Sequence, residues 1–85
     1  MKKIEFDGKK IEYDEKAFDN WRVQRGFACG IEKPVAFYDA IDIIFGGPGK
    51  SDEVSDMFDG STSKVMGVLD LITAEINKAG GTGKN

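Results

Sequence analysis

The chain has no histidine, which removes the commonest general base and the commonest transition-metal ligand. Its single cysteine, Cys29, cannot form an internal disulfide and has no histidine to activate it as a nucleophile. A lone thiol fits a reducing compartment, and its place near a predicted helix end among apolar residues favours a buried structural role. We therefore expect a protein that is not an enzyme and that holds no metal or other cofactor.

Long apolar runs are also missing. No segment approaches the ~20 residues that a membrane-spanning helix needs, and polar residues follow the Met-Lys-Lys start where a signal peptide would have its apolar core. The net charge is −3, with an excess of one positive charge on residues 1–33 and of four negative charges on residues 34–85. The sequence therefore predicts a cytoplasmic protein without a membrane partner. It also argues against general nucleic-acid binding, which needs a continuous basic face.

The most apolar stretch lies between residues 34 and 45. Pro34 suits a first helical position, and Gly46 ends the helix. Asp39 and Asp42 fall between the apolar residues and are expected to face water. The apolar residues recur at intervals of three and four, and so form one stripe of a helix: Val35, Phe37, Tyr38, Ile41, Ile44 and Phe45. We predict a central helix over residues 34–45 on which the other elements pack.

Residues 3–13 alternate in the pattern of a β-hairpin. Asp7-Gly8 is a favoured two-residue turn because both positions need a positive φ. Pairing Phe6 with Lys9 puts the apolar residues on one face and opposite charges across from each other on the other face. The apolar face is Ile4, Phe6, Ile11 and Tyr13, and the charge pairs are Glu5–Lys10 and Lys3–Glu12. An isolated hairpin is barely stable in water, so this apolar face needs a helix against it.

A second helix is predicted over about residues 15–28. Asp14 is its expected N-cap and Gly30 its expected end. Trp21 is expected to face inward as the largest piece of the core. Arg22 and Arg25 flank this side and offer a stacking site for bases, but two arginines in an acidic chain are weak evidence for that function.

Two more helices complete the chain. One covers about residues 52–58 with Ser51 as its cap, and the other covers about residues 64–79, where Gly67 is either a close-packing point or a weak spot. Residues 80–85 are predicted to be a flexible tail. The predicted fold class is α+β, with an N-terminal β-hairpin followed by three to four α-helices packed in a small bundle. Residues 1–79 form a single small domain.

The sequence GGPGKS over residues 46–51 shares letters with a phosphate-binding loop. That loop needs the pattern G-x-x-x-x-G-K-[ST], and aligning Gly49-Lys50-Ser51 with its end puts Ile44 where the first glycine must be. We interpret the segment as the end of one helix followed by the cap of the next. The carboxylates that follow lack the spacing of a calcium-binding EF-hand loop.

Met57, Phe58 and Met66 are the candidate partner-binding residues. They lie on the short third helix and at the start of the fourth. A helix of about two turns covers few side chains, so part of this surface is expected to stay exposed. Methionine-rich apolar surfaces suit adaptable binding of varied helices. Ordinary core packing is the alternative interpretation.

Several segments together suggest a family: the hairpin IEFDGKKIEYDE, a helix with FDNWRVQRG, the segment PVAFYDAIDIIFGG, and a final helix before a polar tail. This layout resembles the small tail assembly chaperones of long-tailed bacteriophages and prophages. The resemblance implies a non-enzymatic protein that binds the long apolar helices of the tail tape-measure protein. It would keep these helices soluble in the host cytoplasm until tail-tube subunits polymerise around them.

Two other functions stay open at this point. One is a structural tail or head-completion subunit that assembles into rings, since a core this small is often supplemented by self-association to a homo-oligomer. The other is a small regulatory nucleic-acid-binding protein that uses Arg22, Arg25 and the Lys-rich hairpin.

Overall fold

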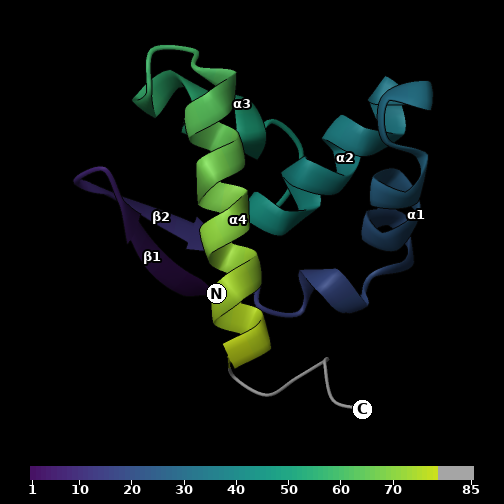
Figure 1. Ribbon diagram of the computed structural model, residues 1–85, viewed down its shortest axis with the longest axis horizontal. Helices are drawn as coiled ribbons and strands as arrows, with labels where there is room; N and C mark the ends of the chain where they lie inside the picture. The colour runs from purple at the N-terminus through teal and green to yellow at the C-terminus, as the bar shows by residue number, and fades with distance from the viewer. Residues whose placement is uncertain (79–85) are drawn as a thin grey trace.

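The computed structural model describes residues 1–78, apart from the side chain of Ile31. Within this range a two-stranded antiparallel hairpin precedes four α-helices, so the predicted α+β class is confirmed (Figure 1). The tail predicted over residues 80–85, and residue 79 before it, lie outside the described residues. The elements are β1 (Lys2–Phe6), β2 (Lys9–Tyr13), the 3-10 helix η1 (Ala17–Asp19), α1 (Trp21–Cys29), the 3-10 helix η2 (Gly30–Glu32), α2 (Pro34–Phe45), α3 (Lys50–Met57) and α4 (Thr62–Lys78).

The hairpin has the predicted register. Ile4 pairs with Ile11 and Phe6 pairs with Lys9, and Asp7 and Gly8 both have the positive φ that the two-residue turn requires. Residues Ile11 and Tyr13 of β2 are buried, while the apolar residues of β1 are only half-buried. β2 therefore lies closer to the core than β1 does.

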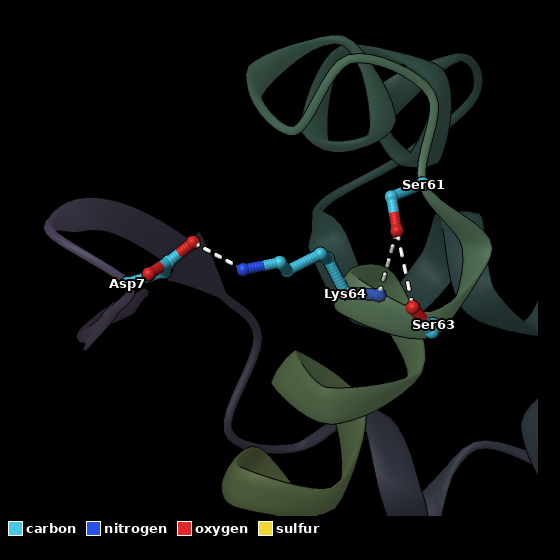
Figure 2. A network of polar contacts seen from close by, with 4 residues as sticks. All are labelled: Asp7, Ser61, Ser63 and Lys64. Atoms are coloured by element: carbon cyan, nitrogen blue, oxygen red, sulfur yellow. Dashed lines mark hydrogen bonds and ion pairs between the residues drawn. The ribbon is translucent and has the colours of Figure 1, made fainter.

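α4 contacts the turn of the hairpin. Near its first turn, Lys64 extends to the hairpin turn and forms an ion pair with Asp7 at 2.6 Å (Figure 2). The hydroxyl of Ser61 accepts a hydrogen bond from the Lys64 backbone N–H at 3.3 Å, which caps the start of the helix. The side of α4 that faces the core is apolar and buried, and consists of Val65, Val68, Leu69 and Ile72.

α2 has the predicted bounds, but part of its predicted stripe is exposed. Ala40, Ile41, Ile44 and Phe45 are buried, whereas Val35 is 76% exposed and Tyr38 is 53% exposed. Neighbouring elements cover the C-terminal turns of α2 more fully than its first two turns. Residues that share a stripe by spacing are thus not all in the core.

The prediction for α1 was wrong at its start and for its largest side chain. The helix begins at Trp21 rather than at residue 15, because the Asn20 side chain accepts a hydrogen bond from the Arg22 N–H at 2.8 Å and acts as the N-cap. Asp14 instead donates its backbone N–H to the Ile44 carbonyl at 2.8 Å, and its carboxylate accepts the Lys16 N–H. Trp21 is 78% exposed and is not part of the core.

Trp21 is exposed because the opposite side of α1 packs on α2. Val23 and Gly26 are the buried residues of α1. A Cβ on Gly26 would lie 2.5 Å from the Ala36 carbonyl oxygen and 2.7 Å from the Ala40 Cβ. The close approach of the two backbones at Gly26 turns Trp21 toward the opposite side of α1, where no element of the described chain covers it.

Candidate functional site

Four aromatic side chains from three elements form a continuous row, which we call the aromatic row: Phe18, Phe27, Phe37 and Tyr38. Phe18 comes from η1, Phe27 from α1, and the last two from α2. Neighbouring ring centroids are 6.1, 5.6 and 5.5 Å apart along the row, which is the range of favourable aromatic pairs. Phe27 is 37% exposed and Tyr38 is 53% exposed, and the other two rings are half-buried. The row is therefore a surface feature and not only a piece of the core.

A hollow lies at each end of the aromatic row, and α4 contributes to both. The Tyr38 hollow has a volume of about 110 Å³ and is lined by Tyr38, Ile41, Ser51, Asp52, Ser55, Thr62, Val65 and Met66. The Phe18 hollow has a volume of about 200 Å³ and is lined by Phe18, Gln24, Thr73, Ile76 and Asn77. Both hollows are smaller than the ~300–1,000 Å³ of typical small-molecule sites, so their size suits single side chains of a polypeptide.

Both apolar and uncharged polar side chains line the two hollows. Asp52 is the one charged residue among the lining residues of either hollow. The Gln24 amide donates to the Phe18 carbonyl, which fixes η1 against α1 beside the Phe18 hollow. This combination of exposed rings, small hollows and few charges is typical of surfaces that bind other proteins.

The three predicted partner-binding residues are not brought together on one surface. Phe58 is only 7% exposed, and its ring packs edge-on against Phe6 with centroids 5.8 Å apart. Met57 is exposed and lines a separate hollow beside Lys10 and Phe45. Met66 is half-buried and lines the Tyr38 hollow. Met66 therefore adjoins the aromatic row, whereas Phe58 belongs to the core.

Sequence reasoning missed the aromatic row as a unit. The spacing places Phe37 and Tyr38 in the core stripe of α2 and gives no reason to group them with Phe18 and Phe27. The signal that could have located the row is the short connection between residues 29 and 34. A short connection favours an antiparallel helix pair, which places the end of the first helix beside the beginning of the second.

The GGPGKS segment joins α2 to α3, and its last residue, Ser51, hydrogen-bonds to Asp42 of α2. Gly46 ends α2 and Gly49 precedes α3, so the segment does separate two helices. Ser51 is not the N-cap, because α3 begins at Lys50 with Gly49 as its N-cap. The Asp42 carboxylate accepts hydrogen bonds from both the backbone N–H and the hydroxyl of Ser51. Asp42 was expected to face water; it is half-buried and stabilises the positive end of α3 instead.

Among residues 1–78, no group of three or more His, Cys, Asp or Glu side chains could hold a metal ion. None of the charged side chains in this range is buried, and Cys29 is half-buried rather than buried as predicted. The shifted pKa values lie on the hairpin and just after it. Burial raises the pKa of Tyr13, a hydrogen bond from Lys64 lowers the pKa of Asp7, and a hydrogen bond from its own backbone lowers the pKa of Glu15. These groups are separate from the aromatic row.

No protein-family model, curated protein or solved structure matches this chain. None of the helices within residues 1–78 combines the length and the apolar character needed to cross a membrane.

Proposed function

We propose that this domain is a non-enzymatic binding protein of the phage tail-assembly-chaperone type, which covers apolar helices of a tape-measure protein before the tail tube forms. The observation that carries the proposal is the half-exposed aromatic row, because exposed apolar patches on a soluble domain often mark sites of interaction with other proteins. The identity of the client comes from the resemblance in segment layout. The mode of binding comes from the surface.

The mode is helix-in-groove recognition. An amphipathic helix presents apolar side chains at intervals of three and four, and successive anchors lie ~5–6 Å apart along its axis. The rings of the aromatic row are spaced at 5.5 to 6.1 Å, so one turn of a client helix advances by about one ring. Client side chains at either end of the row would enter the Tyr38 and Phe18 hollows.

Aromatic rings supply much contact area at a low cost in conformational entropy, because each has only two rotatable side-chain bonds. Met66, at the edge of the Tyr38 hollow, adds an adaptable apolar contact. The contact surface that we propose therefore keeps Met66 of the three predicted residues and centres on Phe27 and Tyr38. The acidic residues on the remaining surface keep the complex soluble.

Co-expression with a tape-measure fragment tests this proposal. The wild-type domain should raise the soluble fraction of the fragment, and Tyr38→Ser should weaken the complex by about tenfold, because an exposed aromatic anchor of an interface contributes ~1–2 kcal/mol. Val35→Ser is the matched control, since Val35 is on the same helix, is more exposed and is not part of the aromatic row. An unchanged soluble fraction with the wild-type domain would remove the basis for the proposal.

One observation favours a second candidate function, which is binding to single-stranded nucleic acid. Trp21 is exposed at the start of α1, and Arg25 lies one turn later on the same side of the helix. An exposed indole beside a guanidinium group is a stacking platform for bases. Quenching of Trp21 fluorescence by an oligonucleotide, reduced steeply by added salt, is the result that this candidate requires.

A further inference from the structure

The outer edge of β1 has unpaired backbone groups. The sheet of the described residues contains β1 and β2 only. In a hairpin with a two-residue turn, Phe6 and Lys9 exchange both of their hydrogen bonds, so residues at even positions of β1 face β2. The N–H and C=O groups of Lys3 and Glu5 consequently point away from β2, and no hydrogen bond recorded among residues 1–78 uses them.

We propose that two copies of this chain pair through β1, antiparallel and centred on Ile4, to form a continuous four-stranded sheet. This register joins Lys3 of one copy to the partner's Glu5, and Glu5 to the partner's Lys3. Both residues of each such pair have outward-pointing backbone groups, so each pair exchanges two hydrogen bonds. The contact is isologous, as a two-fold symmetric dimer requires.

Charge selects this register over its neighbours. The outward-pointing backbone groups belong to every second residue of β1. The two copies can therefore form hydrogen bonds only in registers that differ by two residues along one strand. A shift in one direction places Lys3 opposite the partner's Lys3, and a shift in the other places Glu5 opposite the partner's Glu5. Both shifts put like charges directly across from each other, which destabilises a sheet. Only the register centred on Ile4 gives two attractive pairs within β1 without a like-charge pair, and it also brings the two Ile4 side chains together.

α4 has a surface that suits this arrangement. The absent Cβ of Gly67 would lie 2.8 Å from the Phe6 ring, so this side of α4 lies directly over β1. Leu71 and Ala74 follow one and two turns later on the same side, Leu71 half-buried and Ala74 exposed. A two-fold axis perpendicular to the sheet places both α4 helices on one face of it. Ala74 is small and exposed on this side, so it leaves room for the partner's α4 to approach.

Lysine on an edge strand is a common device against edge-to-edge pairing. That device works because lysines on two approaching strands repel each other. Here Lys3 alternates with Glu5 on the exposed face of β1, which makes the strand complementary to a second copy of itself.

Charge-swap variants test the dimer while they preserve the hairpin. Lys3→Glu/Glu12→Lys and Glu5→Lys/Lys10→Glu each keep an opposite-charge pair across β1 and β2, because Lys3 faces Glu12 and Glu5 faces Lys10. Between copies, each double variant puts like charges together twice. Lys50→Glu/Glu53→Lys swaps an exposed pair on α3 and is the matched control, with the same net charge.

Sedimentation velocity of the full chain over a concentration series is the measurement. Wild type and the α3 swap should form the same dimer, and each β1 swap should weaken it by about tenfold or more. An equimolar mixture of the two β1 swaps should recover a dimer, because position 3 of one variant and position 5 of the other then carry opposite charges. A wild type that stays monomeric, or β1 swaps that dimerise as wild type does, would overturn the proposal.

Discussion

The ring of Phe6 on β1 fills the space beside Gly67 on α4 that a side chain would need. The Phe6 Cζ lies 2.8 Å from the position of a Gly67 Cβ, and the same ring packs edge-on against Phe58, which follows α3. The hairpin, α3 and α4 therefore meet at one ring. The sequence left Gly67 as either a close-packing point or a weak spot, and the contact with Phe6 makes it a close-packing point.

Gly67→Ala is expected to destabilise the domain by about 0–2 kcal/mol. Alanine improves helix propensity by ~1 kcal/mol, but the extra methyl displaces the tip of the Phe6 ring, and overpacking typically costs ~1–3 kcal/mol. Urea unfolding followed by circular dichroism measures the difference. A variant more stable than wild type by over ~1 kcal/mol would mean that the ring moves aside freely.

Gly26→Ala is expected to cost more, about 2–3 kcal/mol. The new methyl would meet the Ala36 carbonyl oxygen and the Ala40 Cβ, and neither atom can move without the α2 backbone. The α1–α2 pair must then separate. Arg25→Ala, at the exposed neighbouring position, should stay within ~0.5 kcal/mol of wild type in the same unfolding assay. Equal effects of the two variants would contradict the close contact at Gly26.

Asp42→Ala is expected to destabilise the domain by about 1–2 kcal/mol, because Ser51 loses the acceptor of two hydrogen bonds at the start of α3. Asp39→Ala removes a carboxylate from the exposed side of the same helix and should change stability by less than ~0.5 kcal/mol. Thermal unfolding of both variants checks the contrast. If both lose the same stability, the contact with Ser51 is not what makes Asp42 important.

The ion pair between Asp7 and Lys64 is expected to make stability depend on pH in the acid range. The pKa of Asp7 is lowered in the folded state, first by the hydrogen bond from Lys64 and then by its charge. The folded state therefore binds the proton less well than the unfolded state. The stabilisation is complete above the ordinary aspartate pKa of ~4 and is lost as the pH falls through the lowered pKa.

Asp7→Asn provides the comparison, since Asn-Gly also forms this turn. The variant should be less stable than wild type near neutral pH, and the gap should close as the pH falls below ~4. Urea unfolding of both proteins at a series of pH values measures the gap. A gap that is constant with pH would show that the ion pair contributes nothing.

Trp21→Ser is expected to change the free energy of unfolding by less than ~0.5 kcal/mol, because the indole is 78% exposed. A core tryptophan would cost ~3–5 kcal/mol on removal. Chemical unfolding monitored by circular dichroism distinguishes the two cases without relying on the indole fluorescence.

The sequence by itself determined the elements that depend on near neighbours along the chain. The hairpin register follows from the Asp7-Gly8 turn and from the charge pairs next to it. The bounds of α2 follow from Pro34 and Gly46, which act within one helical turn. These interactions span a few residues, so a local pattern contains all the information that they need.

Only the tertiary structure decided which apolar sides are covered. Spacing places Trp21 and Val35 among apolar side chains, but the contact at Gly26 and the packing of α2 leave both in water. Asp42 and Ser51 are nine residues apart, and their hydrogen bonds depend on how α3 turns back on α2. The aromatic row arises in the same way, because its rings come from three elements that meet only after folding. Burial depends on what packs against a residue, and that partner is distant in the sequence.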